Sequence, residues 1–172
     1  MTASHGRDEL AAALFDGHYV ALRRLAFVIL GDGGSAEEVV MDTFVKVCSD
    51  PWRFRRLRSP STYLRRAVIN ACRSRLRRKR LERRVAESPA QPPTGISSDV
   101  ESRLDVMAAL QQLPLRQRAC ACLRYLEDLS ESQIADILDC SVGTVKSQLF
   151  KARRTLRELL QNEVEGVPDG RA

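Results

Sequence analysis

The spacing of apolar and polar residues predicts α-helices along most of the chain. Apolar residues recur every three or four positions, which lines one face of a helix, and Val, Ile and Thr never alternate over the length of a strand. The pattern therefore predicts an all-α fold. The expected helices cover about residues 8–30, 36–48, 60–84, 99–113, 115–126, 131–138 and 142–162.

The sequence also marks where several of these helices begin and end. The Gly-rich segment 31–34 is expected to end the first helix, and Ser35 with Glu38 is expected to form a capping box for the second. Three more helices are expected to begin at a serine cap, namely Ser59, Ser130 (with Gln133) and Ser141.

A change of composition divides the chain in two. Residues 86–100 are rich in Pro, Gly and Ser, which is typical of a flexible linker. We therefore expect two small helical domains, at residues 8–85 and 101–163. In the second domain, a short capped helix, a tight turn at 139–141 and another capped helix are the signature of a helix-turn-helix.

Positive charge is concentrated in the first domain. The net charge is +6, and 14 of the 28 Lys and Arg residues lie between residues 53 and 84, where Glu82 is the single acid. This imbalance favours a polyanionic partner, and nucleic acid is the first candidate, with a basic solvated face as the plainer alternative.

Other classes of protein find little support in the sequence. No apolar run approaches the roughly 20 residues of a membrane span, and the first residues lack the apolar stretch of a secretion signal. The five cysteines are scattered and are interpreted as reduced. No catalytic constellation or metal cluster is recognisable. We therefore expect a cytoplasmic protein without membrane insertion that is not an enzyme and carries no metal or other cofactor.

The last predicted helix carries the clearest candidate for a DNA-reading surface. Its buried stripe is expected to contain four apolar residues: Val145, Leu149, Ala152 and Leu156. The opposite face combines hydroxyls, cations and one aromatic ring, from Thr144, Ser147, Phe150, Lys151 and Arg154, with Lys146 and Arg153 on its flank. Such groups bond base edges and phosphates or meet a thymine methyl. An ordinary amphipathic helix is the alternative, but it would gain nothing from Phe150 facing water.

Basic and aromatic residues are interleaved in the first domain around Trp52, Phe54 and Tyr63. Cations can follow a nucleic-acid backbone while aromatic rings hold unstacked bases, so this composition suits single-stranded or opened DNA. Core packing explains Trp52 and Tyr63 equally well.

Two sets of motifs resemble a known family. Gly31-Asp-x₃-Ala-Glu-Glu-Val-Val-x-Asp-x-Phe44 and Tyr63-Leu-Arg-Arg-Ala-Val-Ile-Asn70 resemble region 2 of the extracytoplasmic-function (ECF) sigma factors of bacterial RNA polymerase. Leu113-Pro-Leu-Arg-Gln-Arg118, Tyr125-Leu-Glu-Asp-Leu-Ser130 and Ser141-Val-Gly-Thr-Val-Lys-Ser147 resemble region 4. Both motif sets occur in the family's order.

The resemblance implies a role for each surface. It implies a factor that binds RNA polymerase core enzyme and directs it to promoter DNA, and that an anti-sigma factor holds inactive. Polymerase would be bound by Glu38, Met41 and Asp42. At position 41 the family often has Gln. Bases of the −10 element would be captured by Lys46, Phe54 and Asn70, and the strand backbone would follow Arg66, Arg73 and Arg77. Lys146, Ser147, Phe150 and Lys151 would enter the −35 major groove.

Two other functions remain open at this point. A stand-alone helix-turn-helix regulator of duplex DNA would explain residues 113–162, although it would not explain the basic first domain. An RNA-binding adaptor would explain the first domain but would form no complex with core polymerase.

Overall fold

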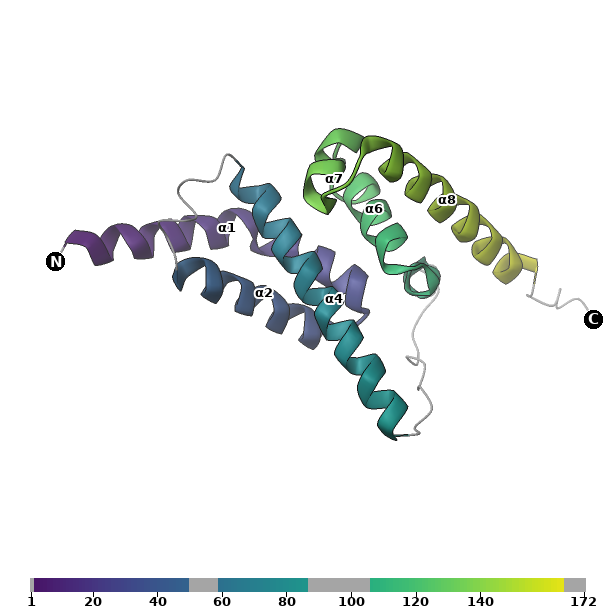
Figure 1. Ribbon diagram of the computed structural model, residues 1–172, viewed down its shortest axis with the longest axis horizontal. Helices are drawn as coiled ribbons and strands as arrows, with labels where there is room; N and C mark the ends of the chain where they lie inside the picture. The colour runs from purple at the N-terminus through teal and green to yellow at the C-terminus, as the bar shows by residue number, and fades with distance from the viewer. Residues whose placement is uncertain (1, 50–58, 87–105, 166–172) are drawn as a thin grey trace, which may run out of the picture.

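The computed structural model describes residues 2–49, 59–86 and 106–165, and it is helical in nearly all of them (Figure 1). The described part contains no strand, so the predicted all-α fold is confirmed. Its helices are α1 (Thr2–Leu30), α2 (Gly33–Ser49), α4 (Pro60–Ala86), a helical segment at 106–112, α6 (Leu115–Tyr125), α7 (Glu131–Leu138) and α8 (Val142–Glu165).

The start of α2 differs from the prediction. The helix begins at Gly33, and the residue before it, Asp32, accepts a hydrogen bond from the backbone N of Ser35 at 2.8 Å. The expected capping box of Ser35 and Glu38 is therefore wrong, because a carboxylate in the preceding turn already satisfies the free backbone donors. Hydrogen bonding from the Ser35 side chain, and then from its backbone N, holds the pKa of Asp32 below its usual value.

The other serine caps are confirmed. Ser130 and Gln133 form a complete capping box, with the Gln133 backbone N donating to Ser130 Oγ at 3.3 Å and the Ser130 N to Gln133 Oε1 at 2.8 Å. Ser59 and Ser141 accept from the backbone N of the third residue after each, at 3.4 and 3.1 Å.

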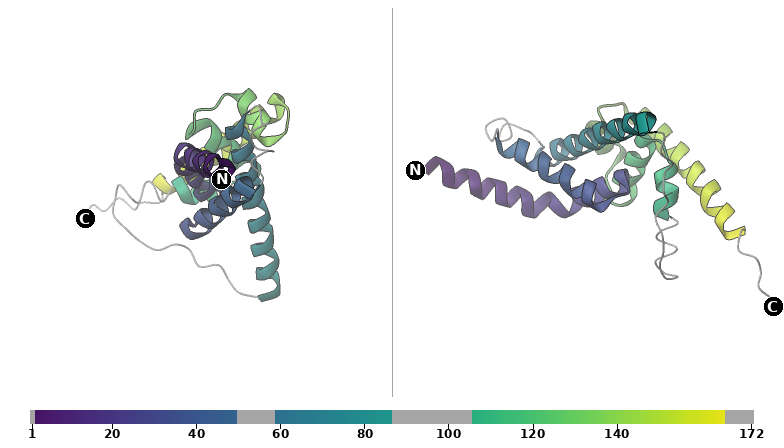
Figure 2. Two further views of the ribbon diagram at one scale, coloured as in Figure 1. Left: turned by 90° about the vertical axis from the view of Figure 1, so that its left-hand side faces the viewer. Right: turned by 90° about the horizontal axis from the view of Figure 1, so that it is seen from below.

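Helices α1, α2 and α4 pack as one group, and α6, α7 and α8 pack as a second (Figure 2). In the first group, Leu22, Ile29, Val40 and Leu64 are almost completely buried. In the second, Leu123, Ile134 and Val145 are buried in the same way. These residues come from the stripes that the apolar spacing predicts.

The two groups also pack against each other, which the sequence pattern did not indicate. Helix α6 lies against α1, and α7 lies against α4. Buried side chains of both groups form one continuous apolar cluster. Residues 87–100 of the expected linker lie outside the described residues.

Gly31 lies at this junction. Its φ of 73° is in the left-handed region, and a Cβ built on it would lie 2.9 Å from Cδ of Gln111 in the second group. Glycine therefore allows both the chain reversal after α1 and the close approach of the second group.

Candidate nucleic-acid interface

The segment α7–turn–α8 has the geometry expected of a helix-turn-helix. Asp139 adopts a left-handed φ of 52° after α7, and the Cys140 backbone N donates to the Ala135 carbonyl at 3.1 Å. Val145, Leu149 and Ala152 turn inward, as predicted, and hold α8 against the rest of the group. The turn and this buried stripe fix which face of α8 points outward.

The outward face of α8 contains most of the side chains expected to read DNA. Phe150 is 63% exposed, and Ser147, Lys151 and Arg154 are exposed with it. Lys146 is exposed and lies 3.8 Å from Glu131, a distance at which an exposed pair contributes little. Thr144 differs, because it is half-buried and its hydroxyl contacts the Ser141 hydroxyl that caps the helix.

 In that contact, Thr144 Oγ1 lies 2.9 Å from Ser141 Oγ, so this side chain supports the start of the helix.

A second candidate surface lies in the first group, between α2 and α4. A groove of about 390 Å³ is lined by Lys46 and Asp42 from α2 and by Asn70, Arg75 and Arg78 from α4. The structure therefore brings together Lys46 and Asn70, two residues that lie 24 positions apart in the sequence. Phe54, the third residue expected to hold bases, lies outside the described residues.

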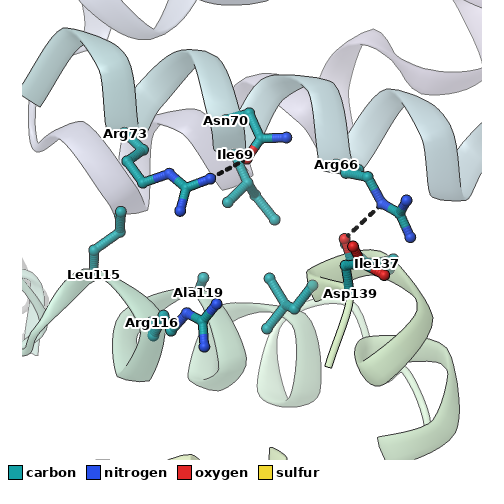
Figure 3. A pocket seen from close by; sticks show the side chains of 10 residues that line it. Arg66, Ile69, Asn70, Arg73, Leu115, Arg116, Ala119, Ile137 and Asp139 are labelled. Carbon is teal, nitrogen blue, oxygen red and sulfur yellow. Dashed lines mark hydrogen bonds between the residues drawn. The ribbon is translucent and has the colours of Figure 1, made fainter. Parts of the chain in front are cut away.

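A cavity between the two groups is lined on the α4 side by Arg66, Asn70 and Arg73 (Figure 3). The cavity measures about 210 Å³, and α4 forms one wall while α6 and α7 form the other. Arg73 Nη2 donates to Asn70 Oδ1 at 2.8 Å. Asn70 therefore lies on the boundary between this cavity and the α2–α4 groove. Arg77 is exposed further along α4.

The structure corrects the expected environment of Arg66. The sequence pattern placed it on the solvated side of its helix, but α7 covers it and leaves it half-buried. Its Nε donates to the Ile137 carbonyl at 3.2 Å, and its Nη2 donates to the Asp136 carbonyl. The covering surface comes from a distant part of the chain, so the local pattern contained no sign of it.

The residues expected to contact polymerase lie on the outer face of α2. Glu38, Met41 and Asp42 are all exposed, and Met41 is 42% exposed. Val45, which sequence reasoning missed, is 62% exposed one helical turn after Met41. Glu38 Oε2 lies 2.6 Å from Arg75 Nη1 on α4. An apolar patch with acidic neighbours suits a protein partner better than it suits DNA.

Sequence reasoning also missed the polar residues that join the two groups. Arg118 is 7% exposed, although it is charged, and burial holds its pKa below the usual value. The side chain of Glu127 is also 7% exposed, and one of its carboxylate oxygens lies 2.5 Å from Arg65 Nη2. A buried charge needs a partner, but the sequence does not indicate which charges will be buried.

Three of the described cysteines are buried. Burial raises the pKa of the Cys72 and Cys122 thiols to about 12 and that of Cys120 to about 11, so these thiols remain protonated and poor nucleophiles. Within the described ranges, no group of His, Cys, Asp and Glu side chains could hold a metal ion. No described helix is long and apolar enough to cross a membrane.

Comparison with known proteins places these features in a family. The family model described as Sigma-70 region 2 matches residues 14–82, and the model described as Sigma-70, region 4 matches residues 103–156. The ECF RNA polymerase sigma factor SigM of Mycobacterium tuberculosis is 31% identical over 86% of this chain and 75% of its own length. SigL of the same species is 33% identical over 92% of this chain and 93% of its own length.

A solved structure shows the same relationship. The sigma factor RpoE of Bartonella quintana, solved in complex with the anti-sigma factor NepR, superposes with a TM-score of 0.67 at 28% identity. The match covers 82% of this chain and 90% of that one. The fold and the two family models thus define a helical transcription-initiation factor. The chain belongs to the ECF group of sigma-70 RNA polymerase sigma factors.

Proposed function

We propose that this protein binds the core enzyme of RNA polymerase and directs it to promoters by reading two DNA elements with separate surfaces. The observation that carries the proposal is that both sigma regions occur in one chain, each with an exposed basic surface. A stand-alone regulator would need only the helix-turn-helix. The proposed boundaries are residues 8–85 for region 2, 86–100 for the linker and 101–163 for region 4.

The −35 element would be read by α8. Its outward face offers Lys146, Ser147, Phe150 and Lys151 to base edges, while Arg154 is positioned for the phosphate backbone. Because Thr144 is engaged with Ser141, we assign it to supporting the helix start next to the phosphates. The contribution of Lys146 and Lys151 depends on the salt concentration, since cations act by displacing counterions from DNA.

The −10 element would be opened and held by region 2. The groove that contains Lys46 and Asn70 has polar groups with which an extruded base can form hydrogen bonds. Arg66, Arg73 and Arg77 follow one another along α4 at helical spacing and would neutralise the phosphates of the strand. Capturing unpaired bases offsets the few kcal/mol that unpairing costs.

The core enzyme would be bound by α2. Met41 and Val45 form an exposed apolar pair, and Glu38 and Asp42 flank it with negative charge. Docking both sigma regions on one enzyme would make two modest DNA contacts act as a single tethered interaction. The protein itself would carry out no covalent chemistry.

We further infer a cytoplasmic location and regulation by an anti-sigma factor. RpoE, the similar solved sigma factor, is described in complex with such a partner.

Run-off transcription tests the proposed function. Core polymerase with this protein and a library of genomic fragments should give discrete transcripts that core polymerase alone does not give. Val45→Glu should weaken the complex with core enzyme on gel filtration, because it places a charge in the apolar pair. Val20→Glu is the matched control, since Val20 is 67% exposed and lies on α1. Failure of the wild-type protein to bind core polymerase at low salt would refute the proposal.

A further inference from the structure

The cavity between α4 and α6–α7 gathers positive charge that its own lining does not balance. Three arginines line it, and Asp139 is the single acid among its described lining residues. One of the arginines, Arg66, already donates to two carbonyls of α7. The other two, Arg73 and Arg116, form no ion pair with a described carboxylate. A cavity lined mainly by one sign of charge concentrates the electric field inside it and attracts the opposite charge.

Arg73 and Arg116 extend from opposite walls of this cavity. Figure 3 shows Arg73 on α4 and Arg116 on α6, with Asp139 further along, on the side of Arg66. Arg73 Nη2 donates to Asn70 Oδ1 at 2.8 Å, which orients that guanidinium and leaves its other N–H groups without a described partner. Two cations that share a cavity repel each other, and an anion between them would turn this repulsion into attraction.

The positive potential continues beyond the cavity. Burial, and then the charge of Arg80 on α4, hold the pKa of Arg118 on α6 below its usual value. A second arginine of α4 therefore lies close enough to a second arginine of α6 for their charges to interact. The cations around the cavity thus belong to a larger basic region, in which an anion is favoured over a wider distance than a single contact.

The lining of the cavity indicates which anions fit. The planar fork of a guanidinium matches two oxygens of a phosphoryl group, and the two forks here come from different helices. Ile69, Leu115 and Ala119 line the same cavity and lower the local dielectric constant, which strengthens charged hydrogen bonds. The volume of about 210 Å³ far exceeds the roughly 30 Å³ that one water molecule occupies in the liquid. The cavity therefore suits a small anion with two phosphoryl groups, one for each free arginine.

We propose that the cavity between α4 and α6–α7 is a binding site for a small diphosphate-bearing anion, which Arg73 and Arg116 hold from opposite walls. Asp139 repels the phosphoryl groups and so directs them to the end of the cavity where these two arginines lie. The site itself does not depend on the proposed function. One consequence does, because a bound diphosphate would occupy Arg73, which is assigned above to the −10 strand, and the two would compete for this side chain.

Isothermal titration calorimetry of the full-length protein with inorganic pyrophosphate tests the site. Arg116→Gln should weaken binding by about ten- to 100-fold, the usual loss when hydrogen bonds to a charged group are removed. Arg116→Lys keeps the charge but lacks the planar fork, so it should recover only part of the affinity. Arg157→Gln is the matched control, because it removes an exposed cation of α8 that does not line the cavity.

Two further titrations define the ligand. Sulfate at the same ionic strength measures the general attraction of anions to a basic protein, and it should bind at least about tenfold more weakly because it offers one tetrahedral group to two guanidinium forks. Nucleoside diphosphates are titrated in the same way. Affinity above that of pyrophosphate would assign the site to a nucleotide, and affinity below it would assign the site to a free diphosphate.

Arginine modification locates the bound anion. Phenylglyoxal reacts with exposed guanidinium groups, and Arg73 and Arg116 are both exposed. Pyrophosphate at ten times its Kd should slow the modification of both by about tenfold, as measured by peptide mass spectrometry. The modification of Arg157 should not change.

Circular dichroism separates loss of the site from loss of the fold. Because Arg116 has no described hydrogen-bond or ion-pair partner, Arg116→Gln without ligand should melt at the wild-type temperature. The proposal is overturned if sulfate binds as tightly as pyrophosphate, if Arg116→Gln binds pyrophosphate as tightly as Arg157→Gln does, or if pyrophosphate leaves Arg73 and Arg116 unprotected.

Run-off transcription distinguishes this site from the DNA surfaces. Arg116→Gln should transcribe with core polymerase at the wild-type level, and a loss would place Arg116 on the DNA and overturn the site. Lack of any transcript with the wild-type protein would instead refute the proposed function. The titrations and the arginine modification would still decide whether the site exists, because neither measurement involves polymerase.

Discussion

The two proposed DNA-reading surfaces are presented in opposite ways. On α8, Phe150 and its basic neighbours face solvent, and their few contacts are with exposed side chains. On α4, Arg66 is half-buried and donates to two carbonyls of α7, and Arg73 is exposed beside the cavity between the two groups. The duplex-reading surface is thus available in this conformation, whereas the path for the opened strand is restricted. Access to the first surface therefore depends on α8 alone, whereas access to the second also depends on how α7 lies against α4.

Arg118 and Arg66, which both bond across the junction of the two helical groups, differ in how deeply they are buried. Arg118 is 7% exposed and donates to four carbonyl or amide oxygens, three of them within region 4. Arg66 is half-buried and donates to two carbonyls of the opposite region. Arg118 therefore stabilises its own helical group as well as the junction between the two groups. The contacts of Arg66 with α7 depend entirely on that junction.

Breaking the open surface should have the largest effect. Lys146→Glu with Lys151→Glu reverses two cations that would contact DNA, each worth about 1–3 kcal/mol. Promoter-dependent transcription should fall roughly 100-fold or more, and binding to core polymerase should stay unchanged. Arg157→Glu, on an exposed position further along α8, is the control. Equal losses in both proteins would indicate a nonspecific charge effect.

Removing the more deeply buried arginine, Arg118, should weaken the whole fold. Arg118→Ala leaves several buried oxygens without a donor and should lower the free energy of unfolding by about 3 kcal/mol. Gln111→Ala removes the bond to the Val28 carbonyl and one of the four acceptors of Arg118, and it should cost about 1–1.5 kcal/mol. Urea denaturation followed by circular dichroism measures both values. Similar values for the two variants would contradict the larger contribution assigned to Arg118.

Truncating the exposed ring on α8 separates reading from stability. Phe150→Ala should reduce transcription roughly tenfold, which corresponds to about 1.4 kcal/mol of lost base contact. Its unfolding midpoint should not change, because the ring is 63% exposed. A loss of stability would show that Phe150 belongs to the core instead.

The smallest expected effect is a pH dependence of stability that arises from His18 on α1. Burial, and then the charge of Arg65, hold the pKa of His18 below 6.5. The unfolded chain then binds more protons between pH 6.5 and the lower native pKa, so stability is lost as the pH falls through this window. His18→Gln should flatten that part of the stability profile. Because His18 is only partly buried, the effect should be modest.

Most of the helices and much of the site could be predicted from local patterns. The buried stripe of α8 and the capping box at Ser130 depend on residues within a few turns of one another. Such regularities are visible in the sequence because helical spacing decides which residues share a face. The outward face of α8 follows from the same spacing.

The contacts between the regions could not be predicted in this way. Arg66 and Glu127 are contacted by segments more than 60 positions away, and their neighbours in the sequence do not indicate these contacts. Likewise, Asp32 rather than Ser35 caps α2, because the helix begins at Gly33, three residues before the predicted start. Long-range burial and the exact first turn are both set by tertiary packing.

The hydrogen bond between Arg73 and Asn70 has a consequence for base selection. A guanidinium carries only donors, so the amide oxygen of Asn70 must face Arg73, and Figure 3 shows the amide nitrogen turned away from it. A nucleobase seated beside Asn70 would then meet an N–H group and not a lone pair. Edges that present a keto oxygen or an unprotonated ring nitrogen are complementary to that group, and an exocyclic amine is not.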